Sequence, residues 1–108
     1  MYRGRIEGNI MNFTEKVFKE CAKIPKGKLS TYSRIAMAIG SPRAFRAVGN
    51  ALNKNRSDKV PCHRVVCSSG KVGGFVYGKF KKIQILKNEG IKINGDKVKN
   101  LEKILFKF

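Results

Sequence analysis

The chain has 108 residues, of which 42% are hydrophobic, so it is long enough for one compact domain with a single modest core. Its 24 Lys and Arg residues against 7 Asp and Glu residues give a formal charge of +17, which makes a polyanion, and above all nucleic acid, the expected partner. The chain has no Trp and no apolar run of about 18 residues, so no membrane interaction is expected.

The first predicted element is a short N-terminal arm, or a single edge strand, over residues 1–11, which show little periodicity. One domain is expected to follow over residues 12–108. Apolar residues recur at helical spacing from Asn12 to Ile24, which predicts a first helix. Cys21 falls on the apolar side of this helix and is therefore expected to be a buried core residue.

Two further helices are predicted in close succession. Ser30 or Thr31 can cap the first of them, and Gly40 suits its C-terminal end. Ser41 as the cap and Pro42 at the first helical position then predict that the next helix starts at once. Two helices joined by so short a turn form a helix-turn-helix unit, an arrangement used by many DNA-binding domains.

The polar side of this third helix carries side chains that can meet phosphates and base edges. Their spacing of three and four residues places them on one face: Arg43, Arg46, Asn50 and Asn53. Ala47 and Gly49 add little bulk beside them, which would let the helix approach a groove closely. A solvated helix face is the alternative, and the helix-turn-helix context together with the net charge favours DNA contact.

A thiol next to the only histidine of the chain indicates where chemistry takes place. Residues 61–66 read Pro-Cys-His-Arg-Val-Val, and a neighbouring imidazole is the commonest means of forming a reactive thiolate near neutral pH. Adjacent side chains of an extended backbone point to opposite sides, so proton transfer from Cys62 to His63 is expected to need a water. With Cys67 these residues match none of the usual zinc spacings, and no metal is expected.

The number of cysteines indicates the compartment. Cys21, Cys62 and Cys67 are an odd number in a chain without a secretory signal. A disulfide framework is therefore disfavoured, and a reducing cytoplasm, in association with the nucleoid, is the expected location.

The second half of the chain predicts a turn, a helix and a small C-terminal unit. Val65 and Val66 favour a strand, and the glycines at positions 70, 73 and 74 indicate a tight turn or hairpin beside the thiol. Residues 79–88 return to helical spacing, with Phe80, Ile83 and Leu86 expected to point inward.

Glu89 follows this helix directly. A carboxylate there opposes the helix dipole unless it has a partner such as His63, and a surface ion pair with a lysine is the alternative. Residues 91–108 are expected to form a short hairpin or arm and a last helix. The predicted fold is mainly α: a compact, winged-helix-like helix-turn-helix domain with a short β-hairpin or turn forming a wall of the active site.

Several motifs occur together and in order. They are Phe13-Thr14, Ile24-Pro25-Lys26-Gly27, Thr31-Tyr32, Arg46-Ala47-Val48-Gly49, Asn55, Pro61-Cys62-His63-Arg64-Val65-Val66, Gly73-Gly74 and Glu89-Gly90. This set resembles the C-terminal domain of the O6-alkylguanine-DNA alkyltransferases, over about Phe13 to Gly90. The family's usual N-terminal domain is nearly absent, so the chain is similar to a short form.

The resemblance implies a single-turnover DNA repair protein. Cys62 would attack the alkyl carbon on guanine O6 and keep the group permanently, with no cofactor. In the family a water links the thiol to the histidine, here His63, and a glutamate, here Glu89, orients the imidazole. Asn55 matches the asparagine that braces the active-site turn.

The resemblance also implies how double-stranded DNA with an alkylated guanine is bound. The recognition helix would lie in the minor groove, and the damaged base would rotate out of the stack. Arg46 would fill the vacated space, while Tyr32 would crowd a phosphate and help to rotate the nucleotide. The alkylguanine pocket would be formed by Val65, Gly73, Gly74, Phe75 and Val76.

Some residues depart from the family pattern. Phe75 stands where a tyrosine is frequent, which removes a hydroxyl near the pocket, and the segment from Asn55 to Pro61 is one residue shorter than in common members. The resemblance leaves the range of alkyl groups and the effect of these changes on rate open.

Two other functions are compatible with parts of the sequence. The alkyltransferase-like proteins bind alkylated DNA without repairing it and flag it for another pathway, but their acceptor position is tryptophan, whereas this chain has Cys62. A helix-turn-helix regulator with an incidental cysteine would leave the Gly73-Gly74 wall and the position of Glu89 unexplained. A monomer is expected, and cooperative binding of copies along DNA is left open.

Overall fold

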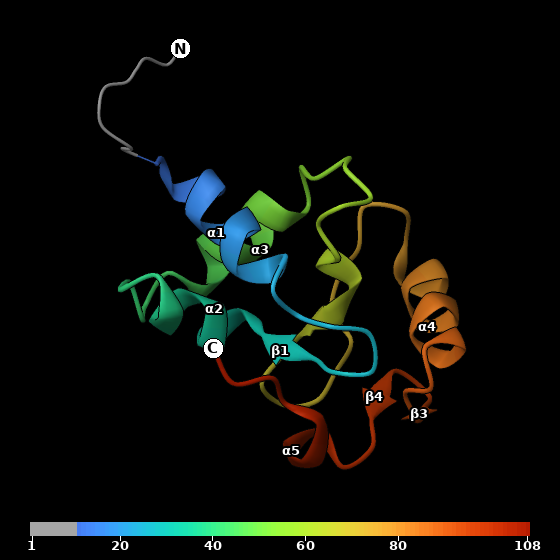
Figure 1. Cartoon of the computed structure of the whole chain (residues 1–108). Helices are drawn as coiled ribbons and strands as arrows, with labels where there is room; N and C mark the ends of the chain where they lie inside the picture. Colours follow the sequence, from blue (N-terminus) through green and yellow to red (C-terminus); the bar gives the residue numbers. More distant parts are fainter. Residues whose placement is uncertain (1–10) are drawn as a thin grey trace.

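The computed structural model describes residues 11–108, so the predicted arm lies outside the described residues except for Met11. The elements in chain order are α1 (Phe13–Cys21), β1 (Ser30–Thr31), α2 (Tyr32–Ala38), α3 (Phe45–Leu52), the 3-10 turn η1 (Cys62–Arg64), β2 (Val65–Val66), α4 (Lys79–Asn88), β3 (Ile93–Asn94), β4 (Lys97–Val98) and α5 (Leu101–Ile104). Helices α1 to α3 gather on one side of β1, and α4 with the β3–β4 hairpin lies on the other side (Figure 1). The mainly helical fold class is confirmed.

Helix α1 begins directly after Asn12, where the apolar spacing predicts. The Asn12 side-chain oxygen accepts from the Glu15 N–H at 2.8 Å, and the Glu15 carboxylate accepts from the Asn12 N–H at 2.9 Å. This reciprocal capping box satisfies two N–H groups that the helix leaves free. Val17 and Cys21 are fully buried, as the apolar stripe predicted. Burial raises the pKa of the Cys21 thiol to about 12, so Cys21 stays protonated and unreactive.

The helix-turn-helix unit is present, but its second helix starts later than predicted. Thr31 caps α2 by accepting from the Arg34 N–H at 3.1 Å. The prediction that the next helix begins at Pro42 is wrong: the Ser41 N–H bonds Ala36 O, which closes the end of α2, and a turn follows. Helix α3 begins only at Phe45 and has no side-chain cap.

The strand beside the active site pairs differently from the predicted hairpin. Strand β2 runs parallel to β1, with Ser30 opposite Val65 and Thr31 opposite Val66. The chain after β2 closes as a turn, in which the Cys67 N–H donates to Lys71 O at 2.8 Å. A parallel pairing of segments this far apart in sequence leaves no local pattern, so the sequence could not reveal it.

The β1–β2 pair lies between two hydrophobic clusters. Val65 packs with the residues of α1, α2 and α3, whereas Val66 packs with Leu29, Val72 and Leu86. The alternation of side chains along a strand explains why neighbouring valines enter different clusters. The strand therefore anchors the end of η1 to both halves of the molecule.

Helix α4 has the predicted bounds, but the side of the helix that is buried differs from the predicted one. Phe80, expected to point inward, is 89% exposed, whereas the Lys82 side chain is completely buried. Leu86 is buried as predicted, and the C-terminal segment forms the expected hairpin and last helix. Among residues 11–108, no helix has both the length and the apolar character needed to cross a membrane.

Candidate active site

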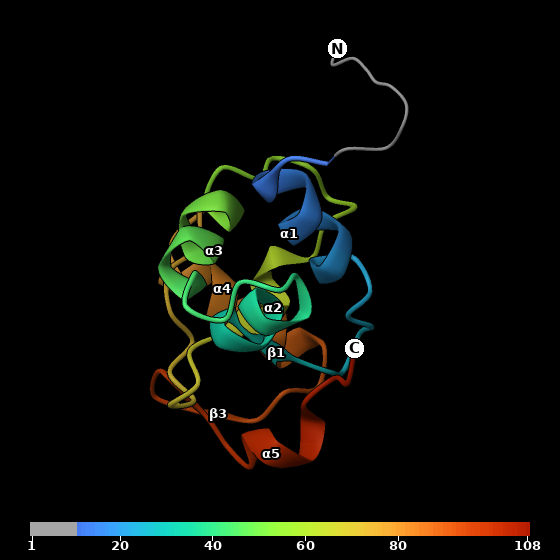
Figure 2. The same cartoon turned by 90° about the vertical axis from the view of Figure 1, so that its left-hand side faces the viewer.

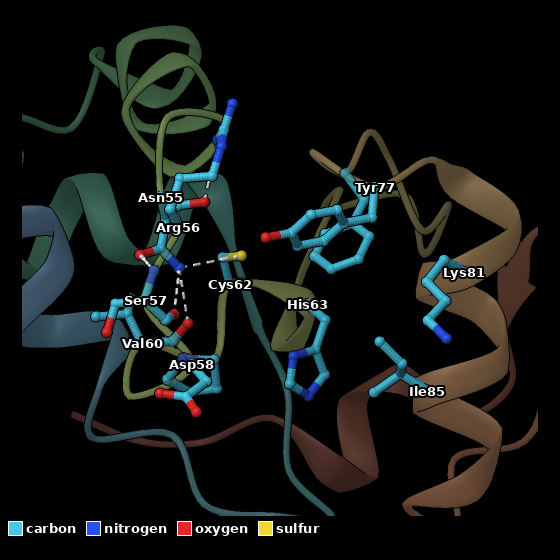
Figure 3. A pocket seen from close by; sticks show the side chains of 12 residues that line it. Asn55, Arg56, Ser57, Asp58, Val60, Cys62, His63, Tyr77, Lys81 and Ile85 are labelled. Carbon is cyan, nitrogen blue, oxygen red and sulfur yellow. Dashed lines mark hydrogen bonds between the residues drawn. The ribbon is translucent and has the colours of Figure 1, made fainter.

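The Cys62 thiol lies in a tight turn at the edge of a pocket (Figure 3). Cys62, His63 and Arg64 form the 3-10 turn η1, in which the Arg64 N–H donates to Pro61 O at 2.9 Å. The backbone of Cys62 and His63 thus turns here before it enters β2, so the side-chain alternation of an extended strand does not apply to this pair. A water between thiol and imidazole stays a prediction.

Asn55 holds the loop that precedes the thiol. Its side chain is buried, and its amide nitrogen donates to Ser57 O at 3.1 Å and to Val60 O at 2.9 Å. The same nitrogen lies 3.5 Å from the Cys62 sulfur. Since Asn55 Oδ1 also accepts from the Ser57 N–H, the amide fixes the loop and places a donor at the sulfur.

His63 and Glu89 meet as predicted, and Arg64 joins them. His63 Nε2 lies 2.9 Å from Glu89 Oε2. Arg64 donates from Nε to Glu89 Oε1 at 3.0 Å and from Nη2 to Oε2 at 2.9 Å, and its Nη1 donates to Ile24 O. Burial acts to raise the pKa of Glu89, but the hydrogen bonds from Arg64 and His63 outweigh burial and hold this pKa below 4.5.

This arrangement explains why a carboxylate is tolerated at the C-terminal cap of α4. Two N–H groups of Arg64 bind Glu89 in parallel, which is the strong, bidentate geometry of arginine and carboxylate. With Nε2 of His63 bound to the carboxylate, Nδ1 is the ring nitrogen left to take a proton from the side of the thiol. The sequence indicated that Glu89 needed a partner, but not that Arg64 would supply most of the contact.

Tyr32 packs closely against the glycine-rich segment that the sequence predicted as a wall. It is the first residue of α2, and its ring lies beside Gly49 of α3, where an added Cβ would be 3.8 Å from the ring. A Cβ on Gly73 would lie 2.8 Å from the Tyr32 hydroxyl, and Gly73 has φ +76°, so this position requires glycine for both space and conformation. Burial raises the pKa of Tyr32 to about 12.

Lys82 was missed from the sequence, yet its side chain joins three segments of the chain near Cys62. Its buried ammonium donates to Val65 O at 2.6 Å, to Gly74 O at 3.1 Å and to the Tyr32 hydroxyl at 3.3 Å. Burial lowers the pKa of Lys82 to about 8. The buried lysine thereby fixes β2, the glycine segment and the start of α2 relative to one another.

The pocket next to Cys62 has a volume of about 310 Å³. It is lined by Asn55, Arg56, Ser57, Asp58, Val60, Pro61, Cys62, His63, Phe75, Tyr77, Lys81 and Ile85. Tyr77 projects across the opening toward Cys62, and Lys81 and Ile85 of α4 lie opposite the Asn55 loop (Figure 3). Tyr77 brings a hydroxyl to this pocket, although Phe75 lacks one.

The predicted wall residues do not all line this pocket. Only Phe75 of the predicted set does; Val65 is buried with its carbonyl bound to Lys82, and Gly73, Gly74 and Val76 belong to the segment behind. Their contact with guanine stays a prediction. Within residues 11–108, no cluster of three His, Cys, Asp or Glu side chains could hold a metal ion.

The predicted DNA-contacting residues lie on and beside α3. Arg46, Ala47 and Asn50 are exposed on the helix, and Gly49 is partly covered by Tyr32. Arg43 and Asn53 are exposed too, but Arg43 lies in the turn before α3 and Asn53 is its C-cap. Of the four polar residues predicted to share one face of this helix, only Arg46 and Asn50 therefore lie within α3.

Comparison with known proteins identifies the family. Residues 12–91 match the family model described as 6-O-methylguanine DNA methyltransferase, DNA binding domain. The chain belongs to this family. A probable methylated-DNA–protein-cysteine methyltransferase of Acanthamoeba polyphaga mimivirus is 51% identical over 75 residues, which are 68% of this chain and 50% of that protein. A methylated-DNA–protein-cysteine methyltransferase of Saccharolobus islandicus is 48% identical over 82 residues, 75% of this chain and 52% of that protein.

Solved structures of family members agree with the fold. S. pombe Atl1 in complex with damaged DNA containing O6-carboxymethylguanine is 33% identical with a TM-score of 0.79, covering 88% of this chain and 94% of that one. Mycobacterium tuberculosis OGT in complex with DNA is 40% identical with a TM-score of 0.71, covering 76% of this chain and 51% of that one. The chain spans about half the length, or less, of the curated relatives that it matches.

Proposed function

We propose that this protein repairs DNA by transferring the alkyl group of O6-alkylguanine to its own Cys62. The observation that carries the proposal is the joint placement of Asn55 at the Cys62 sulfur and of the His63–Glu89 pair beside it. In the reaction a bond forms between sulfur and the alkyl carbon, and the bond between that carbon and guanine O6 breaks. The thiol proton passes through water to His63 and finally to the released guanine, so no cofactor is needed.

The charges of the site support this path. The Glu89 carboxylate stabilises an imidazolium on His63 when the thiol proton arrives, as a buried carboxylate does for a catalytic histidine. Arg64 keeps Glu89 ionised and oriented by its two hydrogen bonds. The Asn55 amide, directed at the sulfur, stabilises the negative charge that develops there.

Duplex DNA containing alkylated guanine is the proposed partner. The structural neighbours crystallised with DNA support this choice, and Arg46 and Asn50 on α3 are exposed to meet it. The base must leave the stack because a thiol in a pocket cannot reach O6 in a paired guanine. Arg46 would fill the vacated space, and Tyr32, fixed at its hydroxyl by Lys82, would crowd a phosphate and help to rotate the nucleotide. The acceptor must stay a free thiol, so we infer a reducing compartment, the cytoplasm.

A lesion-binding protein that does not transfer the alkyl group is the second candidate. The close match to Atl1, with a TM-score of 0.79, favours it, because that structure contains O6-carboxymethylguanine in DNA. Cys62 and its partners favour transfer. Binding alone does not require a thiol that lies beside the Asn55 amide and next to a histidine–glutamate pair.

Intact mass measurement separates the two functions. After incubation with a duplex containing O6-methylguanine under reducing conditions, the wild type should gain one methyl group on the peptide with Cys62. Cys62→Ala should bind the same duplex and gain none, because its pocket and α3 are unchanged. Tight binding by wild type with a free thiol and no mass gain would favour the lesion-binding function instead.

A further inference from the structure

The C-terminal hairpin extends into a three-stranded arrangement with the segment after β2. Strands β3 and β4 pair antiparallel, with Ile93 opposite Val98. On the other edge of β4, Lys97 forms a bridge with Lys71, and the Val98 N–H donates to Gly70 O at 2.8 Å. The turn after β2 is therefore joined to the edge of the β3–β4 hairpin by an antiparallel bridge and backbone hydrogen bonds.

The register of this sheet places four lysines on one face. Residues directly opposite each other point to the same side, and so do residues two apart along a strand. Lys71 lies opposite Lys97; Lys99 follows two residues after Lys97; and Lys92 lies opposite Lys99, whose N–H donates to Lys92 O. All four side chains are exposed. We call this set, Lys71, Lys92, Lys97 and Lys99, the lysine face.

The opposite side of the same sheet is part of the core. Val72 is fully buried and Val98 is 5% exposed, and both pack with Leu29, Val66 and Leu86. This anchoring prevents the sheet from turning its lysines elsewhere. Asn94, opposite Lys97, lies beside the lysine face on the same side of the hairpin, and its side chain can also donate hydrogen bonds.

Like charges directly opposite each other on a sheet destabilise it, and here two such pairs are adjacent. The nearby carboxylates do not neutralise them. Asp96, at the turn of the hairpin, lies 3.5 Å from Lys79, and Glu102 of α5 lines the same surface pocket as Lys97 without forming an ion pair with it. Among residues 11–108, the fold thus holds four cations together with no ion pair between them and a carboxylate.

We propose that the lysine face binds the phosphate backbone of duplex DNA beyond the stretch covered by α3. The inference rests on the proposed function for its partner, DNA. A polyanion with regularly spaced charges complements closely set cations and releases its counterions on binding. Helix α3 and the segment after β2 lie along the same side of the molecule, with the hairpin at the lower end of that side (Figure 2). A duplex on α3 therefore has a route to the lysine face.

A pair of variants with equal net charge tests the inference. In the first, Lys71, Lys92, Lys97 and Lys99 are changed to Gln, which lowers the formal charge from +17 to +13. In the control, the same change is made at four exposed lysines of α1 and the loop that follows it: Lys16, Lys19, Lys26 and Lys28. Binding of both is measured against salt concentration on duplexes of about 10 and about 25 base pairs, the shorter covering roughly one helical turn.

The DNA affinity of the lysine-face variant should depend less on salt concentration, because its phosphate contacts are lost. Each lost contact reduces the slope of log affinity against log salt by about 0.9, so on the long duplex the slope should become about 2 to 4 shallower. The control should change much less, and on the short duplex the two variants should bind alike. Equal slopes for both variants on the long duplex would overturn the inference and leave only a net-charge effect.

Two further measurements keep the outcome interpretable. At low salt the lysine-face variant should unfold at a higher temperature than wild type, because two repulsive pairs are gone, and high salt should remove this difference. Alkyl transfer to the short duplex should persist in this variant; its absence in wild type would refute the proposed function, not this inference. Binding of RNA or of anionic vesicles that depends on these lysines, while DNA binding does not, would also overturn the proposal.

Discussion

Replacing Lys82 by Met should preserve the fold and impair the reaction. The side chain of Met has a similar volume and removes a fully buried ammonium with three oxygen acceptors. Lowering the Lys82 pKa from 10.5 to about 8 corresponds to about 3 kcal/mol that the folded state loses by keeping the charge at pH 7. The variant recovers this energy.

The opposing cost comes from the acceptors left behind. The carbonyl of Val65 is buried with its residue and loses its donor, which costs about 1–3 kcal/mol, whereas Gly74 is exposed and its carbonyl can turn to water. The two effects nearly cancel, so the free energy of unfolding at pH 7 should change by less than about 2 kcal/mol. The Tyr32 hydroxyl and the glycine segment both lose their contact with the Lys82 ammonium. A displacement of these groups by about 1 Å should slow the reaction by roughly 10- to 100-fold.

Urea unfolding and single-turnover alkyl transfer measure the two effects separately. Because the pKa of Lys82 is lower in the folded than in the unfolded state, the unfolded chain binds more protons between pH 8 and 10.5. This lysine therefore makes the wild type more stable as pH rises through that window, and Lys82→Met should lack the rise. A Met variant that transfers the alkyl group at the wild-type rate would refute the anchoring role, and a loss of stability above about 4 kcal/mol would refute the balance of charge burial against hydrogen bonding.

Three other substitutions and one labelling experiment test the site. Glu89→Gln should slow transfer by about 100-fold or more, since His63 loses its carboxylate partner. Because the pKa of Glu89 is lowered in the folded state, the variant should also lack the part of the wild-type stability that is lost as pH falls below 4.5. Unchanged transfer rates at all pH values would argue against a role of the His63–Glu89 pair. Asn55→Ala should cost about 1–3 kcal/mol of stability through the unpaired Val60 carbonyl and also slow transfer, as seen by urea unfolding and single-turnover assays; a stability loss without any rate loss would reduce Asn55 to a loop brace. Arg46→Ala should slow repair in duplex far more than in a single strand, and equal losses on both substrates would contradict its place in the vacated stack. A small thiol reagent should modify the partly exposed Cys62 well before the buried Cys21 in the folded protein, with peptide mass mapping as the readout and faster labelling of Cys21 as the contrary result.

The sequence predicted features that depend on local chemistry. The apolar spacing that starts at Asn12 marked the beginning of α1, and the position of Glu89 after α4 indicated a partner, which proved to include His63. Helix α4 was bounded correctly because its spacing and the glycine after it are local signals. The motif around Cys62 indicated the family, and the match of residues 12–91 to the family model confirmed it.

Features that depend on distant contacts could not be predicted in this way. Lys82 is buried because oxygen atoms from β2, the glycine segment and α2 surround its ammonium, and none of these is near it in sequence. For the same reason the inward stripe of α4 was misassigned to include Phe80. The start of α3 was misplaced because the residues after Ser41 form a turn, in which the Ala44 N–H donates to Ser41 O, and the helix begins only after that turn.

The pairing of β1 with β2 has a consequence for how the molecule unfolds. The two hydrophobic clusters meet at this short ladder, and the Leu29 backbone continues it by bonding the backbone of Ile104 and Phe106. Neither half can open without breaking bonds that the other half also uses, which favours a single cooperative transition. The amides of Val65 and Val66 should therefore exchange with solvent only at the rate of global unfolding, and Cys62, a few residues before them, is held next to this ladder.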